Sequence, residues 1–206
     1  MGDRSIMLAR KSSKGQFQKV RTLGYGAFGC VDLCKVELKK SYAKKGDQVA
    51  IKRMKRENIS DDLLANKEAL VLNKLAHQHI VRYLDNFKDS LGQFCIVMEF
   101  CDKGTLEDWL SSRPVKPREE FRIWRLVYQF SSALSFLHSQ HPPILHNDLK
   151  PANILCNTHP DNGLIDIKMS DFGVCNILGD SFYSELIFPN SVYPRPDSLL
   201  HVPRRP

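Results

Sequence analysis

The sequence predicts an α+β fold in which a β-rich first half is followed by a more helical second half. Three observations indicate this: β-prone runs separated by turns up to residue 101, one helical pattern among them, and a long apolar helical pattern over residues 118–140. At 206 residues the chain is expected to form one domain, or two small lobes that share one cleft.

Five β-prone runs are expected in the first half. Two of them lie within residues 17–38, on either side of a glycine-rich turn at 24–29. A Lys-Lys-Gly-Asp turn at 44–47 precedes the third run, which starts with Val49-Ala50-Ile51-Lys52, and the last two span 80–87 and 94–100.

A helix is predicted between the third and fourth of these runs. Ser60 is expected to be its N-cap, because a serine followed by Asp61 and Asp62 suits a first helical turn. Spacings of four, four and three place one set of residues on a single face: Leu64, Glu68, Leu72 and Leu75.

The second half begins after Gly104 with a short helix expected at 105–110 and a long one at 118–140. The long helix carries a wide apolar arc, so burial on more than one side is expected. This arc consists of Ile123, Val127, Phe130, Leu134 and Leu137, widened by Trp124 and Tyr128. Short strands are expected at 154–156 and 165–169, and the five prolines from residue 181 onward predict an irregular tail.

The net charge of +7 lies in the first half of the chain. Residues 1–101 hold 19 basic and 11 acidic residues, whereas residues 102–206 hold 11 and 12. Basic runs such as residues 52–56 could attract nucleic acid or anionic lipid. No RNA-binding aromatic motif accompanies them, so a solvated surface is favoured and no nucleic acid partner is expected.

Cysteine usage and hydropathy indicate a cytoplasmic protein, with a nuclear location as the alternative. The six cysteines form no CxxC pair and no metal-type spacing with histidine, so reduced thiols are expected. No apolar run approaches the roughly 18 residues of a membrane span, and the first residues lack a secretory pattern. No membrane association is expected.

The glycine-rich turn, LGYGAFGCV, has the G-x-G-x-x-G spacing of phosphate-binding loops in Gly24, Gly26 and Gly29. Glycines let the backbone approach phosphate oxygens closely. The dinucleotide-binding version of this spacing opens a helix, whereas here a β-prone run follows. A strand–turn–strand cover over a nucleotide is therefore favoured.

The VAIK run places Ala50 and Lys52 on the same face of a strand. Lys52 alone could be an exposed strand lysine. Glu68 argues against that reading, because it shares a helix face with leucines and a carboxylate turned toward a core needs a cationic partner. A Lys52–Glu68 pair is predicted.

A third set of polar residues lies in ILHNDLKPANIL and in the DFG triplet that follows it. Asp148 is suited to orient an attacking hydroxyl and accept its proton, and Lys150 to steady a phosphate as charge develops. Asn153 and Asp171 are suited to hold magnesium through oxygen atoms. Each residue could instead serve a turn or a cap, but their joint order and spacing favour phosphoryl transfer.

With these motifs in view, the chain resembles a eukaryotic protein kinase over about residues 17–175. The D-L-K-P-A-N form resembles serine/threonine kinases, with a lean toward stress kinases that act on a translation initiation factor or toward NEK-type kinases. The resemblance implies a complete small β-rich lobe with its helix, a partial large lobe, and transfer of the ATP γ-phosphate to protein Ser or Thr hydroxyls with Mg²⁺.

The resemblance also implies specific roles for residues. The catalytic set would be Asp148, Lys150, Lys52 and Glu68, and the magnesium ligands Asn153 and Asp171. ATP would contact Leu23, Gly24, Gly26, Gly29, Val31, Ala50, Lys52, Met98, Glu99, Cys101 and Leu155, with residues 99–101 as a hinge that holds adenine through backbone groups. The stacked spine of the family would be Leu72, Tyr83, His146 and Phe172.

Two departures from the family pattern stand out. Asn147 replaces the arginine of the His-Arg-Asp triplet, which pairs with a phosphorylated activation loop in the family. The catalytic groups themselves remain, so activation that does not depend on this arginine is expected. After Gly173 the family motifs fade, and the helices that would cover the long helix are expected to be missing.

These departures leave two alternatives open beside the enzyme. The chain could be an inactive truncated kinase that binds nucleotide or dimerises through its small lobe, or an incomplete gene or splice product. The expected organisation is an N-terminal extension at 1–16, the small lobe and hinge at 17–101, the partial large lobe at 102–180 and the tail at 181–206.

Overall fold

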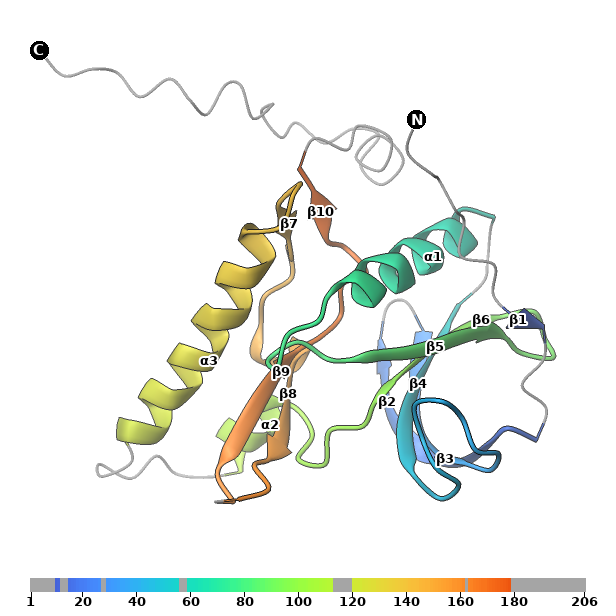
Figure 1. Cartoon of the computed structure of the whole chain (residues 1–206), viewed down its shortest axis with the longest axis horizontal. Coiled ribbons are helices and arrows are strands. Elements are labelled where there is room, and N and C mark those ends of the chain that lie inside the picture. The colour runs from blue at the N-terminus through green and yellow to red at the C-terminus, as the bar shows by residue number, and fades with distance from the viewer. Residues whose placement is uncertain are drawn as a thin grey trace, which may run out of the picture.

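A computed structural model describes residues 10–11, 15–26, 29–55, 59–112, 120–161 and 163–178. The predicted tail at 181–206 and most of the predicted N-terminal extension lie outside the described residues. Within the described part, the predicted α+β architecture is present: a sheet with one long helix on one side of the molecule, and helices with short strand pairs on the other (Figure 1).

The sheet contains six strands in the order β1-β5-β6-β4-β3-β2. They are β1 (Arg10–Lys11), β2 (Phe17–Gly26), β3 (Gly29–Val36), β4 (Gln48–Met54), β5 (Tyr83–Lys88) and β6 (Phe94–Glu99). All neighbours are antiparallel except β1 and β5. The strand predicted at 80–87 begins later, at Tyr83, because Ile80 and Val81 pair instead with Met169 of another strand.

The sheet is apolar on one face and mixed on the other. Directly paired residues of antiparallel strands share a face. The apolar face forms a buried cluster of Cys34, Val36, Val49, Ile51, Phe87, Cys95 and Val97. On the opposite face Val31 pairs with Lys52, and Ala50 pairs with Met98. Four of the predicted nucleotide-contacting residues, Val31, Ala50, Lys52 and Met98, therefore lie on one face, whereas Glu99 pairs with Val49 of the apolar face.

Helix α1 (Ile59–Lys74) lies beside β5 and β6 (Figure 1). The predicted N-cap at Ser60 is wrong, because Ser60 is already inside the helix, which begins at Ile59. The predicted inward face is correct over its described part: Leu72 and Leu75 are buried, together with Glu68.

The second half starts with α2 (Leu106–Ser111), whose N-cap Thr105 forms a reciprocal capping box with Asp108. The remaining elements are α3 (Glu120–His138), β7 (Ile144–Leu145), η1 (Pro151–Asn153), β8 (Ile154–Thr158), β9 (Ile165–Met169) and β10 (Asn176–Ile177). β8 and β9 form a hairpin, and β7 pairs with β10.

Helix α3 is buried on one side only in the described structure, so the predicted burial on more than one side is wrong here. Gln129, Ala133 and Leu137 form its buried face. Within the predicted arc, Ile123 and Val127 are exposed, and Trp124 and Tyr128 are each 69% exposed. A periodic pattern reports which positions are apolar, but it does not report what covers them.

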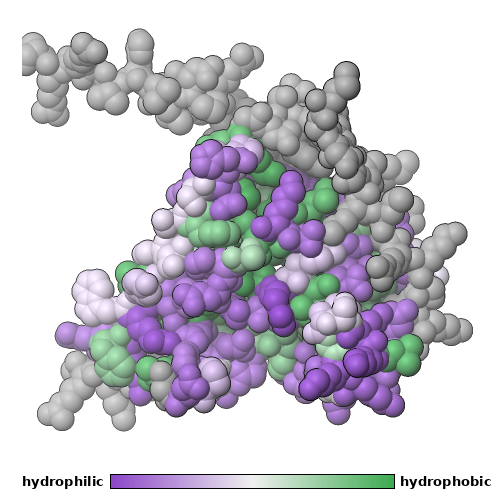
Figure 2. All heavy atoms as spheres, in the orientation of Figure 1, coloured by the Kyte–Doolittle hydropathy of each residue, from purple (hydrophilic) through white to green (hydrophobic). Residues whose placement is uncertain are grey.

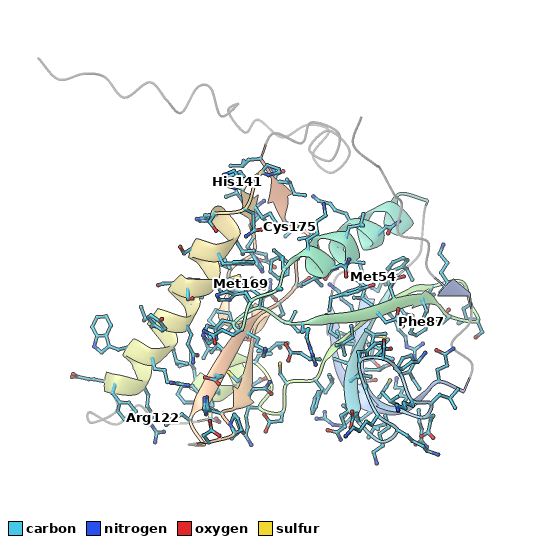
Figure 3. All side chains as sticks on the ribbon, viewed as in Figure 1. Met54, Phe87, Arg122, His141, Met169 and Cys175 are labelled. Atoms are coloured by element: carbon cyan, nitrogen blue, oxygen red, sulfur yellow. The ribbon has the colours of Figure 1, made fainter. Side chains whose placement is uncertain are left out.

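One continuous core joins the two halves of the molecule. Leu72 and Met98 from the first half belong to the same buried cluster as Ala133, Leu137 and Phe172 from the second. Figure 3 places Met169 and Cys175, two further members, between α3 and α1, where Figure 2 shows apolar residues among hydrophilic ones on the surface. Among the described helices, none is long and apolar enough to cross a membrane.

Candidate active site

The centre of the site is Lys52, which binds two carboxylates. Its Nζ atom lies 2.8 Å from Glu68 Oε1 and 2.8 Å from Asp171 Oδ1. Lys52 comes from β4, Glu68 from α1, and Asp171 from the segment after β9, so one ammonium group connects three elements. The predicted Lys52–Glu68 pair is present, and Asp171 joins it.

Electrostatics keep Lys52 charged. Burial disfavours the ammonium form, but the carboxylates of Glu68 and Asp171 outweigh burial and raise the pKa of Lys52. Glu68 is 1% exposed, so removing Lys52 would leave a buried carboxylate without its cation. The triad therefore ties the position of α1 to the position of Asp171.

The predicted catalytic loop brings Asp148, Lys150 and Asn153 together. Lys150 Nζ donates to Asp148 Oδ2 at 2.8 Å, and Asn153 Nδ2 donates to the same oxygen at 2.7 Å and to the Asp148 carbonyl at 2.9 Å. The hydrogen bonds from Lys150 and Asn153 lower the pKa of Asp148. Asp148 is thus an ionised, partly exposed carboxylate with a fixed orientation.

The magnesium candidates have donor groups that suit a hard cation. Because the Asn153 amide nitrogen is engaged by Asp148, its amide oxygen is the atom that can face a metal. The Asp171 side chain is 32% exposed, which leaves it accessible as well as bound to Lys52. Ser170, which precedes Asp171, donates from both its backbone N–H and its hydroxyl to the Asn153 carbonyl at 2.9 Å. These residues fit a magnesium site.

The three motif glycines differ in structural role. Gly29 has a φ of +145°, and an added Cβ atom would lie 1.9 Å from the Arg53 carbonyl oxygen on β4. Gly24 has open space around an added Cβ, and the nearest atom to one on Gly26 would be 4.0 Å away. Packing therefore requires glycine at Gly29, whereas the fold does not require it at Gly24 or Gly26.

The predicted adenine slot takes residues from both halves. Ala50 and Met98 are nearly buried and directly paired, Val31 is half-buried on the same sheet face, and Leu155 packs against the common core from β8. Leu23 lies at an irregularity of the β2–β3 pairing and is 36% exposed.

The hinge residue Glu99 uses its side chain for structure. Its carboxylate accepts from Lys168 Nζ at 2.8 Å and from the Arg82 N–H at 2.7 Å. This links the end of β6 to β9, so only the backbone of Glu99 is available to a nucleotide. Cys101, the last hinge residue, is buried, and burial raises its thiol pKa to about 12.

The four predicted spine residues are assembled. His146 and Phe172 are in ring contact, with centroids 4.8 Å apart, and both are buried. Leu72 and Phe172 belong to the common core, and Tyr83 packs against it. Burial lowers the pKa of His146, and its Nε2 atom lies 2.9 Å from the Ser170 carbonyl oxygen.

Three polar side chains that the sequence did not single out as partners also have defined contacts. Lys67, 2% exposed, donates from Nζ to the Cys175 carbonyl at 2.6 Å, and Asn147 Nδ2 donates to the Val174 carbonyl at 3.3 Å. Asp32, 1% exposed, binds Lys19 and Arg53 at 2.7 and 2.9 Å. The sequence gives no signal for these contacts, because a polar residue within a strand or helix pattern usually lies in solvent.

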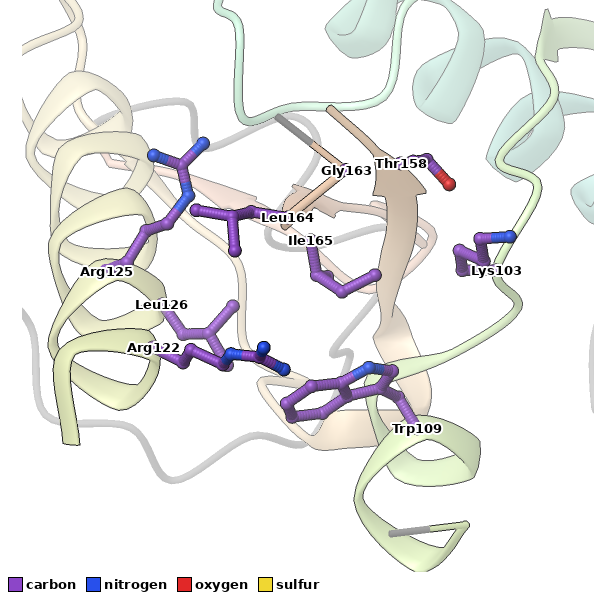
Figure 4. Close-up of a pocket in the computed structure, with 9 residues that line it drawn as sticks. All are labelled: Lys103, Trp109, Arg122, Arg125, Leu126, Thr158, Gly163, Leu164 and Ile165. Atoms are coloured by element: carbon purple, nitrogen blue, oxygen red, sulfur yellow. The ribbon is translucent and has the colours of Figure 1, made fainter. Parts of the chain in front are cut away.

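A separate cavity of about 370 Å³ lies between α2, α3 and the β8–β9 hairpin (Figure 4). Its lining includes Trp109, Arg122, Arg125 and Leu126, and contains none of the predicted site residues. Arg125 is held by Asp166 at 2.5 Å, so part of its positive charge is already neutralised.

Compared with known protein families, residues 17–199 match the Protein kinase domain. The chain belongs to the protein kinase family. The match extends past Cys175, where the sequence motifs end, and it confirms the predicted kinase-like α+β fold. Protein kinases in general use ATP and Mg²⁺.

Curated relatives are serine/threonine kinases by name. The chain is 32% identical over 191 residues to the probable serine/threonine-protein kinase nek2 of Dictyostelium discoideum, covering 89% of this chain and 43% of that protein. It is 28% identical over 193 residues to human serine/threonine-protein kinase ULK1, covering 91% and 17%. Zebrafish (Danio rerio) serine/threonine-protein kinase Nek8 is 33% identical over 165 residues, covering 79% and 22%.

The chain therefore spans less than half the length of these relatives. The two Nek proteins agree with the predicted lean toward NEK-type kinases.

Proposed function

We propose that this protein kinase domain transfers the γ-phosphate of ATP to Ser or Thr hydroxyls of proteins. The observation that carries the proposal is the Lys52 triad. The Lys52–Glu68 pair at 2.8 Å is a contact that phosphoryl transfer in this family requires, and the DFG aspartate, which would hold Mg²⁺, lies 2.8 Å from the same lysine.

In this proposal, five of the predicted catalytic and metal-binding residues each have a role: Asp148, Lys52, Lys150, Asn153 and Asp171. Asp148 orients the substrate hydroxyl and accepts its proton, for which its lowered pKa keeps it ionised at neutral pH. Lys52 engages nucleotide phosphates, and Lys150, next to Asp148, stabilises charge on the transferred group. Asn153 and Asp171 would hold Mg²⁺, which supplies neutralisation of phosphate charge when bound.

Support for a hydroxyl substrate of the Ser/Thr type comes from Lys150 and from the relatives' names. Lys150 contacts Asp148 at 2.8 Å, so a cation stands beside the carboxylate that would meet the substrate. The adenine of ATP would lie among Val31, Ala50, Met98 and Leu155, with the backbone of residues 99–101 along its edge.

The proposal is tested by assaying transfer of radiolabelled phosphate from ATP to a mixture of proteins, followed by identification of the modified amino acid. Asp148→Asn should reduce transfer by about 10²–10⁴-fold, because the proton acceptor is lost, while nucleotide binding persists. Asp161→Asn makes the same chemical change in the exposed turn between β8 and β9, and should have no effect.

Equal activity in wild type and Asp148→Asn would contradict the proposal. Nucleotide binding without any transfer in wild type would instead support the alternative of a regulatory module. Label on tyrosine rather than serine or threonine would contradict the substrate class.

A further inference from the structure

The five residues that follow the DFG triplet, 174–178, are each bound to the rest of the molecule by hydrogen bonds or strand pairing. The carbonyls of Val174 and Cys175 accept from the side chains of Asn147 and Lys67. The next two residues form β10, in which Asn176 pairs with Leu145 and Ile177 with Ile144 of β7. The Leu178 N–H then donates to the Pro143 carbonyl at 2.9 Å.

Among these contacts, the one from Lys67 is the most buried. The Lys67 side chain is 2% exposed, and its Nζ atom reaches the Cys175 carbonyl oxygen at 2.6 Å. A buried ammonium group needs acceptors, because desolvation of a charge is costly. A hydrogen bond from a charged donor is also stronger than one from a neutral donor.

Because Lys67 lies on α1, its contact attaches this helix to the residues that follow the DFG triplet. Lys67 and Glu68 are adjacent, so one turn of α1 binds Cys175 through the first and Lys52 through the second. Lys52 in turn binds Asp171, four residues before Cys175. Helix α1 is thereby attached to residues 171–175 at two points: at Asp171 through Lys52, and directly at the Cys175 carbonyl.

Asn147 supplies a weaker contact from the catalytic loop. Its φ is +64°, a left-handed conformation that asparagine adopts more readily than most residues. Its side chain is exposed and donates over 3.3 Å, which is a long hydrogen bond.

We propose that Lys67, assisted by Asn147, is a positioning residue that latches residues 174–178 to α1 and the catalytic loop. The latch acts on backbone carbonyls, and it keeps Asp171 and α1 in the arrangement in which both contact Lys52. Its effect on phosphate transfer rests on the proposed function, but the latch itself does not.

Hydrogen–deuterium exchange tests the latch without any need for activity. In Lys67→Met, which keeps the length of the side chain without its donors, the amides of residues 175–178 should exchange about ten- to a hundredfold faster. Lys67→Arg restores a cationic donor and should return exchange close to wild type. Lys74→Met makes the matched change at an exposed position of the same helix and should leave these amides unchanged.

Kinetics then separate positioning from general destabilisation. If the chain transfers phosphate, Lys67→Met should lower kcat by about tenfold or more while the KM for ATP changes much less, and Lys67→Arg should recover most of kcat. A wild type without transfer activity would overturn the proposed function, and the exchange result would still decide the latch.

Unchanged exchange at residues 175–178 in Lys67→Met would overturn the latch, as would equal acceleration in Lys74→Met. If Lys67→Met does not fold, Asn147→Gly removes the other donor without backbone strain, because glycine tolerates the left-handed conformation. Faster exchange at the same amides in that variant would support the latch, and no change would overturn it.

Discussion

The buried ion pairs of Lys52 contribute little to the free energy of folding, and their main effect is to fix the relative positions of the groups that they join. A cation that is 9% exposed at its side chain gains little free energy from pairing, because desolvation opposes the attraction. Its two carboxylates come from different elements, Glu68 from α1 and Asp171 from the segment after β9. The pair therefore specifies an arrangement in which the predicted phosphate-binding and metal-binding groups face the same space.

The glycine-rich turn allows a prediction at the same scale. Gly29→Ala should lower the free energy of unfolding by about 1–3 kcal/mol, because the new Cβ would overlap the Arg53 carbonyl and the backbone is at positive φ. Gly24→Ala should leave the melting temperature unchanged and weaken nucleotide binding, since only the approach of phosphates is affected. Thermal melts with nucleotide titrations of both variants would check this.

Equal losses of stability in the two glycine variants would contradict that assignment. So would unchanged nucleotide affinity in Gly24→Ala, since this glycine would then serve neither the fold nor the phosphates.

Residue-level expectations succeeded where a physical requirement linked two positions. Glu68 on an apolar helix face needs a cation, which predicts the pairing with Lys52 that the structure contains. Lys67 could not be found in this way, because a single lysine on a helix usually lies in solvent. Its partner is a backbone carbonyl, which every residue possesses and which no sequence pattern marks.

At the scale of elements, strand and helix types followed from the sequence, and their boundaries and partners were less predictable. The loss of Ile80 and Val81 from β5 depends on pairing with Met169, about ninety residues away along the chain. Helix α1 begins at Ile59, one residue before the predicted cap, and helix ends commonly vary by one or two residues.

Helix α3 is the element whose environment was predicted least well. Its apolar pattern is real, but five large apolar side chains are exposed in the described structure: Phe121, Ile123, Trp124, Val127 and Tyr128. Contiguous exposed apolar surface promotes association between molecules.

We expect the double variant Trp124→Gln and Tyr128→Gln to reduce self-association while changing the free energy of unfolding by less than about 0.5 kcal/mol per site. Light scattering against protein concentration and a thermal melt would measure the two effects. A large loss of stability would show that these side chains are covered in solution, which would contradict their exposure.

At the scale of the whole molecule, one core and one ion triad join the sheet to the helical half. Core residues from α1, β6 and α3, together with Phe172, are in the same cluster, so the sheet and the helical half are not independent units. The sequence could predict the lobes and their motifs, but not this shared packing, because contacts between distant segments leave no local pattern. The contacts among the spine residues Leu72, Tyr83, His146 and Phe172 are visible only in the structure, because these residues are far apart in the sequence.

The central claim is that this chain holds the nucleotide-binding and catalytic groups of a protein kinase in their working arrangement. The most direct test is a thermal melt of residues 1–206 with and without excess Mg-ATP, repeated for Asp171→Asn, which weakens the proposed metal site. Ligand at 100 times its dissociation constant should stabilise the wild type by about 2.7 kcal/mol. We expect a cooperative transition that shifts upward, with a smaller shift in Asp171→Asn. A transition that nucleotide does not move, or the absence of a cooperative transition, would contradict the claim.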